Sequence, residues 1–136
     1  MNKVFPFQKK IIKPWGFELI LTPSNVPVTT KILHLKAKTR FSLQYHEIKE
    51  ETLVLINGEA KIIYGDSLDN LAEETMEKEK GYFIPQGLIH RCQAITDCDI
   101  LESSTPELGT TVRLQDDYDR RDETEEERQL NRNKLT

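Results

Sequence analysis

Cysteine is scarce in this 136-residue chain, which has only Cys92 and Cys98. Two cysteines are too few for the disulfide framework of a small secreted domain, and they lack the paired spacing of a zinc finger. We therefore expect both to be reduced thiols in a cytoplasmic protein. The first residues also lack the apolar stretch and small-residue cleavage site of a signal peptide, which favours the same localisation.

Long apolar runs and a basic excess are missing as well. No apolar run approaches the roughly 20 residues that a membrane-spanning helix needs, so we expect no membrane association. Lysine and arginine number 19 against 23 aspartates and glutamates, which gives a net charge of −4. A nucleic-acid-binding surface usually shows as a basic stripe, so this balance argues against DNA or RNA as a partner.

The chain does contain a series of short segments with the composition of β-strands. They are rich in apolar and β-branched residues and are separated by Pro, Gly, Ser and Asn, which favour turns. Eight segments lie at 16–22, 28–36, 41–46, 51–56, 59–65, 81–87, 90–96 and 98–105, and 110–116 is a candidate for a ninth. No helical segments alternate with them, as they would in a parallel α/β fold. We predict an all-β domain, a small antiparallel β-barrel or jelly roll.

The length fits one domain, and the composition divides the chain into three parts. Residues 1–12 are expected to form an N-terminal arm, 13–120 the β domain and 121–136 a polar tail. The tail has the pattern of either a helix with i,i+4 charge pairs or a frayed terminus. Residues 66–80 are also polar, and we interpret them as a hairpin or loop rather than a helix, because strands flank them.

The strand predicted at 51–56 is apolar on both faces after Glu51. Such a strand is usually covered on both sides. A second sheet would cover one side and another subunit the other. Together with the aromatic residues Phe5 and Phe7 in the arm, and the general need to cover strand edges, this pattern predicts a homodimer.

Side chains that bind metals gather around the start of this strand. Gln44 and His46 lie two residues apart, so in a strand they point to the same face. Glu51 begins the next strand, and His90 follows a Pro- and Gly-containing turn further along. Two imidazoles, a carboxylate and a carboxamide form a candidate site for one divalent ion, Zn, Mn, Fe, Co or Ni. In the alternative, the same residues hydrogen-bond one another without a metal.

The spacing of these four residues resembles the paired motifs of the cupin superfamily, in which His, His, Glu and His hold one metal on a small antiparallel barrel. Gln44 stands at the first of these positions, followed by His46, Glu51 and His90. More narrowly, the segments KPWGFELIL, SLQYHEIKEE, YFIPQGLIHR and VRLQDDYDR resemble the cupin domain of type II mannose-6-phosphate isomerases and their stand-alone relatives. The glutamine is usual in that subgroup, whereas Lys49 departs from an arginine in its pattern.

The resemblance implies a metal-dependent enzyme that interconverts an aldose phosphate and a ketose phosphate through an enediol. That chemistry needs a base for the C2 proton and cations for the oxyanion and the phosphate. Glu102, which shares a strand face with Ile100, and a ligand-bound water are the candidates for the base. Lys31, on an apolar strand face, and Arg113, in the last predicted strand, are the candidates for substrate binding. Exposed strand cations are the structural alternative for both.

Other functions are compatible with the same fold and the same candidate metal ligands. Two histidines and a carboxylate also suit an Fe(II) dioxygenase or a metal-assisted lyase acting on a small molecule. A ligand-binding or sensor cupin without catalysis is a third alternative, because a fold does not determine a function.

Overall fold

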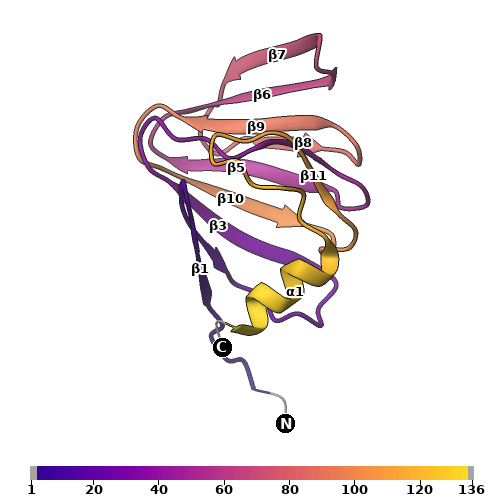
Figure 1. Cartoon of the computed structure of the whole chain (residues 1–136). Helices are drawn as coiled ribbons and strands as arrows, with labels where there is room; N and C mark the ends of the chain where they lie inside the picture. Colours follow the sequence, from indigo (N-terminus) through magenta and orange to yellow (C-terminus); the bar gives the residue numbers. More distant parts are fainter. Residues whose placement is uncertain (1–2, 135–136) are drawn as a thin grey trace.

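Two antiparallel β-sheets face one another in the computed structural model, which describes residues 3–134 (Figure 1). Sheet A has six strands in the spatial order β1 (Lys9–Lys13), β2 (Gly16–Ile20), β3 (Thr29–Leu35), β10 (Cys98–Ser104), β5 (Glu51–Asn57) and β8 (Gly81–Ile84). Sheet B has five, in the order β11 (Thr111–Gln115), β4 (Leu43–His46), β9 (Ile89–Ala94), β6 (Ala60–Ser67) and β7 (Asn70–Thr75). A helix, α1 (Glu125–Lys134), follows the last strand. The arrangement confirms the predicted all-β fold.

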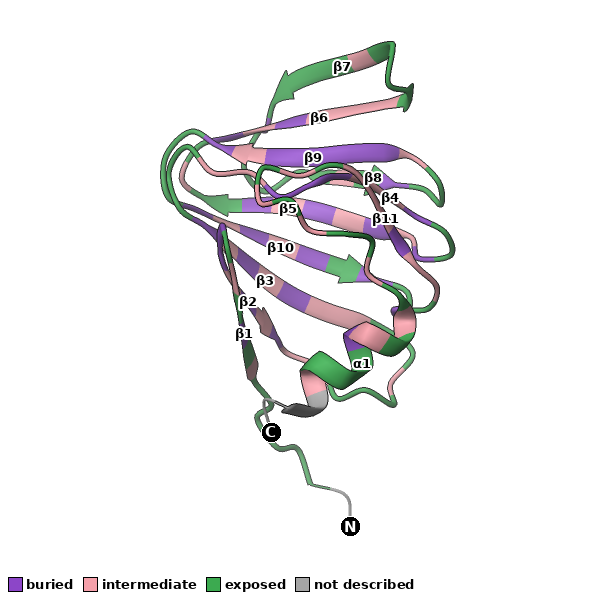
Figure 2. Cartoon of the chain, in the orientation of Figure 1, coloured by how far each residue is buried: buried purple, intermediate pink, exposed green. Residues whose placement is uncertain are grey.

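Alternating side chains build the interior between the sheets, as the banded burial along β3, β5 and β10 shows (Figure 2). Leu33 and Leu35 of β3 and Leu53 of β5 are buried in one core cluster. Burial of each such side chain contributes about 1.5–3 kcal/mol. The same alternation continues to Lys31 on β3 and Glu102 on β10, which are partners in the β3–β10 register. The inward face of sheet A is therefore apolar along part of its length and charged at the pair Lys31–Glu102.

Residues 66–80 include the end of β6 and all of β7, which pair as a polar antiparallel hairpin. This confirms the hairpin interpretation of that stretch. The strand β1 was not predicted, although it pairs with β2 from Lys9 to Lys13 and begins within the expected arm. Ile11 is buried and its neighbour Ile12 is exposed. Two adjacent isoleucines hide the alternation by which the other strands were recognised.

The polar tail contains a helix with a recognisable beginning. Thr124 accepts a hydrogen bond from the Glu127 backbone N–H at 3.1 Å through its side-chain oxygen, which is the contact of a helix N-cap. Three glutamates occupy the first turn, where the helix dipole favours negative charge. The part of the chain that the structure describes contains no helix long and apolar enough to span a membrane.

Candidate metal centre

Three candidate metal ligands meet in the barrel interior. His46 ends β4, Glu51 begins β5 and His90 lies in β9, and all three are buried. One nitrogen or oxygen atom of each lies within 4.8 Å of the others. The register of β4 and β9 places Gln44 opposite His90. The structure thus brings together the four residues that the spacing singled out.

Gln44 lies beside the other three with its amide nitrogen toward them. Its Nε2 is 3.4 Å from Nε2 of His46, while its Oε1 accepts a hydrogen bond from Ser42 Oγ at 2.5 Å. An amide nitrogen is a donor and no metal ligand. Gln44 would serve as a fourth ligand only after its carboxamide turned to exchange the positions of Oε1 and Nε2.

Two hydrogen-bond acceptor atoms face each other in the site, one from His90 and one from Glu51. Nδ1 of His90 is 3.0 Å from the Leu88 carbonyl oxygen, which can only accept, so Nδ1 carries the proton and Nε2 presents a lone pair. That Nε2 lies 2.9 Å from Oε1 of Glu51. Among residues 3–134, His90 Nε2 has no hydrogen-bond donor, and Glu51 Oε2 has no hydrogen bond beside its ion pair with Lys49 at 3.3 Å. Because an unpaired buried acceptor that faces a carboxylate is costly and a cation between the two would satisfy both, these residues fit a metal ion.

Burial and local charge keep the imidazoles and the carboxylate in the forms that bind metals. Burial and the nearby ammonium of Lys49 lower the pKa of His46 to about 4, so its ring is neutral at physiological pH. Burial opposes ionisation of Glu51, but the ammonium of Lys49 holds the pKa of its carboxyl well below the usual range. Neutral imidazole nitrogens with one carboxylate suit first-row transition metals and zinc.

A buried lysine connects the metal-binding set to the candidate base. Nζ of Lys49 lies 3.3 Å from Glu51 Oε2 and donates a hydrogen bond to Glu102 Oε2 at 3.1 Å. Burial and the negative charge of Glu51 raise the pKa of Glu102 to about 7, against the opposing effect of Lys49. A carboxyl group with such a pKa can both accept and return a proton near neutral pH. Glu102 therefore lines the same cavity as His46 and Glu51, and its role as the base stays a prediction.

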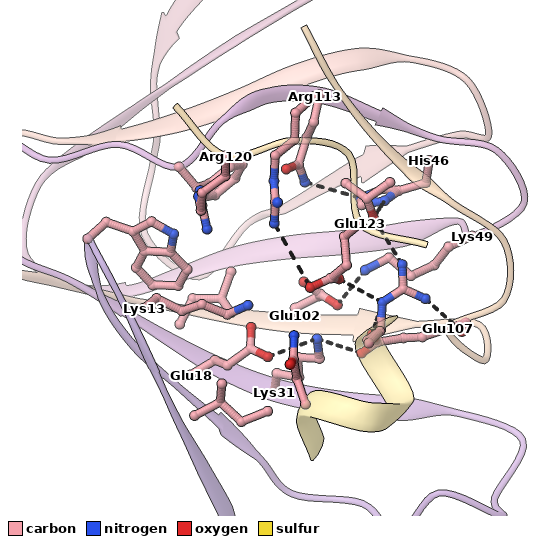
Figure 3. Close-up of a pocket in the computed structure, with 18 of the residues that line it drawn as sticks. Lys13, Glu18, Lys31, His46, Lys49, Glu102, Glu107, Arg113, Arg120 and Glu123 are labelled. Atoms are coloured by element: carbon pink, nitrogen blue, oxygen red, sulfur yellow. Dashed lines mark hydrogen bonds and ion pairs between the residues drawn. The ribbon is translucent and has the colours of Figure 1, made fainter. Parts of the chain in front are cut away.

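Lys31 is buried in the same cavity but is already paired (Figure 3). Its ammonium lies 2.5 Å from Glu107 Oε1 and 3.5 Å from Glu18 Oε1. Burial disfavours the charged ammonium, yet the carboxylates of Glu107 and Glu18 raise the pKa of Lys31 above its ordinary value. These contacts give Lys31 a structural role in the cavity wall, in addition to the substrate-binding role expected from sequence.

Arg113 reaches into the cavity from β11 and points toward Glu123 (Figure 3). It donates a hydrogen bond to the Arg121 carbonyl oxygen at 2.7 Å, and its Nη2 lies 4.0 Å from Glu123 Oε2. Its buried Nε has no hydrogen-bond partner among the described residues. Arg113 thus contributes a positive charge to the cavity wall and keeps one unsatisfied N–H group. The cavity has a volume of about 450 Å³, enough for a small sugar phosphate.

Most of the charged residues that line this cavity were not predicted from the sequence. The missed residues are Lys13, Glu18, Lys49, Glu107, Arg120, Glu123, Arg128 and Arg132. Glu18 occupies a buried position of an alternating strand, between Gly16 and Ile20, so the pattern that identified Lys31 would also have found it. Glu107 lies in the connection between β10 and β11, where no periodicity marks it.

Replacement of Lys31 by methionine tests its structural role. Lys31→Met leaves the carboxylates of Glu18 and Glu107 buried beside each other with fewer countercharges, so we expect the free energy of unfolding to fall by about 3 kcal/mol. Urea denaturation measures the change. Lys61→Met, which breaks the more exposed Lys61–Glu73 pair, is the matched control and should cost less than about 1 kcal/mol. Equal stability of the two variants would contradict the role assigned to Lys31.

A family model described as the mannose-6-phosphate isomerase C-terminal domain matches residues 2–108. No curated protein matched the sequence. Solved structures resemble the fold at low sequence identity. A deletion mutant of Bacillus subtilis oxalate decarboxylase OxdC superposes with a TM-score of 0.69 at 19% identity, over 84% of this chain and 33% of that one.

Two further structures give the same result. The formate complex of Lactobacillus farciminis oxalate decarboxylase has a TM-score of 0.66 at 19% identity, over 79% of this chain and 35% of the other. CapF with the inhibitor 3-isopropenyl-tropolone has a TM-score of 0.60 at 15% identity, over 74% and 31%. The chain spans about a third of the length of these structures, and at such identities the likeness shows the fold alone.

Proposed function

Because this chain belongs to the family of mannose-6-phosphate isomerase C-terminal domains, within the cupin superfamily, we propose that it isomerises a sugar phosphate with one bound divalent metal ion. The observation that carries the proposal is that one cavity is lined by the candidate metal ligands His46 and Glu51, by the candidate base Glu102 and by an excess of cations. The third candidate ligand, His90, contacts Glu51 at 2.9 Å. Seven lysines and arginines line the cavity against five glutamates. This excess favours an anionic ligand even before a metal adds its charge.

His46, Glu51 and His90 would hold the metal ion, with Gln44 as a fourth ligand or as a hydrogen-bond donor to a molecule bound beside it. When bound, the ion would act as a Lewis acid toward the carbonyl and hydroxyl oxygens of the sugar. The coordination of two imidazoles and one carboxylate leaves positions for the substrate.

Glu102 is the proposed base. Its carboxylate removes the proton from C2 of the aldose phosphate, the electron pair of the broken C–H bond forms a C1–C2 double bond, and the C1–O1 π pair moves onto O1. The O2 hydroxyl proton then moves to O1, so that the intermediate stays at the enediolate level. The electron pair on O2 forms the C2 carbonyl of the ketose, and the C1–C2 π pair takes the proton back from Glu102 at C1. Lys49, which donates a hydrogen bond to Glu102 Oε2, orients the carboxylate. Glu102 ends the cycle in the state in which it began.

Arg113 is the proposed contact for the phosphate. A guanidinium binds phosphate with charge-assisted hydrogen bonds, and Arg113 has an unpaired buried Nε among the described residues. Lys31 would contribute its positive charge to the same cavity while it stays paired with its two carboxylates. The sugar would then lie between the metal ligands and Arg113.

The test is an isomerisation assay with the metal-loaded protein. Mannose 6-phosphate in D₂O should yield fructose 6-phosphate, with deuterium introduced at the exchanging carbon when the proton on Glu102 equilibrates with solvent. No turnover of any aldose or ketose phosphate by protein with one bound metal would contradict the isomerase proposal. Oxygen uptake with a small-molecule substrate would favour a dioxygenase, and ligand binding without turnover would favour a sensor.

We also propose that the chain forms a homodimer through the outer face of sheet A. Ile56 and Phe83 on that face are 43% and 60% exposed, and sheet faces with exposed apolar side chains are typical of interfaces. Analytical ultracentrifugation should give twice the 15.8 kDa mass of one chain. Ile56→Glu/Phe83→Glu should give a monomer of normal fold, because it places four charges in the interface of the dimer. A wild-type protein that remained monomeric at high concentration would contradict this proposal.

A further inference from the structure

The last part of the chain lies beyond the residues that match the family, yet it reaches the metal-binding cavity. The match ends at residue 108, whereas α1 begins at Glu125. Arg128, Asn131 and Arg132 of this helix line the same cavity as His46 and Glu51. Figure 1 shows α1 beneath the ends of β3 and β10. This helix is therefore part of the wall of the site.

Arg128 has a hydrogen-bond acceptor for each of its five N–H groups. Nε donates to Glu123 Oε1 at 2.9 Å, and Nη1 donates to the carbonyl oxygens of Glu107 at 3.0 Å and Gly109 at 3.3 Å. Nη2 donates to the Gly109 carbonyl oxygen at 3.3 Å and to Thr111 Oγ1 at 3.2 Å. The residue is only 6% exposed. A planar guanidinium with all its donors engaged is held in one orientation.

Thr111 connects Arg128 to a candidate metal ligand. It pairs with His46 in the β11–β4 register, and its Oγ1 lies 3.1 Å from Nδ1 of His46. The backbone N–H of Thr111 donates to the Glu123 carbonyl oxygen at 2.9 Å, and the Glu123 N–H donates to the Thr111 carbonyl oxygen at 3.0 Å. The C-terminal segment thus holds both the backbone and the side chain of the residue that contacts the His46 ring.

We infer that Arg128 is a positioning residue for the metal centre and that α1 completes this centre from outside the family match. If His46 binds a metal through Nε2, its Nδ1 carries the proton and donates a hydrogen bond to an acceptor. Thr111 Oγ1 is that acceptor, and its two lone pairs serve His46 and Arg128. Arg128 keeps the hydroxyl oxygen in place, and the hydroxyl keeps the imidazole in the orientation and tautomer that present Nε2 to the metal. This inference rests on the proposed metal site.

Co²⁺ binding to the full-length protein tests the inference, by titration and by the visible absorption spectrum of the bound ion. Arg128→Met and Thr111→Val should each weaken Co²⁺ binding about 10–100-fold, the range for loss of a group that orients a metal ligand. Both should also change the absorption bands, because the His46 ring is reoriented. Circular dichroism shows whether each variant keeps its fold.

Two controls separate this role from general packing. Arg121→Met breaks an ion pair with Glu127 of the same helix at a position outside the lining of this cavity, and Thr111→Ser keeps the hydroxyl. Both should bind Co²⁺ within threefold of the wild type. Wild-type affinity and spectrum in Arg128→Met, or an equal loss in Arg121→Met, would overturn the inference while leaving the metal site intact. A wild-type protein that bound no Co²⁺ would overturn the metal site and the inference with it.

Discussion

Replacement of Glu102 by glutamine is expected to lower kcat for sugar-phosphate isomerisation about 10³-fold while one metal ion stays bound. A general base contributes about 10²–10⁴-fold to a rate, and glutamine cannot accept the C2 proton. Its carboxamide oxygen still accepts the hydrogen bond that Lys49 donates to Glu102, so the cavity should keep its shape. The measurement is steady-state kinetics together with the metal content of the same sample.

Asp99→Asn is the matched control for Glu102→Gln. Asp99 lies on the same strand, β10, but hydrogen-bonds His34 and Asn57 away from the cavity. We expect it to keep kcat within threefold of the wild type. Turnover of Glu102→Gln at the wild-type rate would remove Glu102 from the mechanism and favour a ligand-bound water as the base.

Loss of both histidine ligands is expected to abolish metal binding without unfolding the protein. In His46→Ala/His90→Ala only Glu51 and Gln44 remain, and one carboxylate is too weak to hold a transition metal in competition with water. Metal at 100 times its Kd should stabilise the wild type by about 2.7 kcal/mol, and this stabilisation should vanish in the variant. Urea denaturation with and without metal measures the difference, and metal analysis gives the stoichiometry.

The third histidine of the chain supplies the control. His34→Ala removes a side chain that bonds Asp99 and stacks on Phe17 away from the cavity. It should leave both the stoichiometry and the metal-dependent stabilisation unchanged. One tightly bound metal ion in His46→Ala/His90→Ala would show that the ion is held elsewhere.

Three of the four candidate metal-binding residues could be predicted from their local spacing in the sequence. Gln44 and His46 are two apart in a strand, and Glu51 starts the next one, so strand periodicity alone places them near one another. His90 came from its match to the cupin motif, because nothing local to residue 90 says which strand it pairs with. Glu102 and Lys31 were likewise found through alternation with apolar neighbours. The burial of these residues was predictable because one face of each strand is buried and the period of a strand is two, whereas their roles stay predictions.

The charged network behind the site was not predictable in the same way. Glu107 lies in an irregular connection and meets Lys31 across 76 positions of sequence, so its burial depends on tertiary structure alone. Lys49 was seen only as a departure from a family pattern, although it bridges Glu51 and Glu102. Arg128 lies in a tail that was equally compatible with a frayed end, because composition does not show what a polar helix packs against.

The metal centre can be located by anomalous diffraction from a crystal of the protein grown with Zn²⁺ or Co²⁺, measured at the absorption edge of that metal. We expect one strong peak per chain, within about 2.0–2.2 Å of Nε2 of His46, Nε2 of His90 and a carboxylate oxygen of Glu51. The same map would show whether Gln44 Oε1 turns toward the ion. No peak at these residues in metal-saturated protein, or a peak bound only by other residues, would show that they do not form the metal centre.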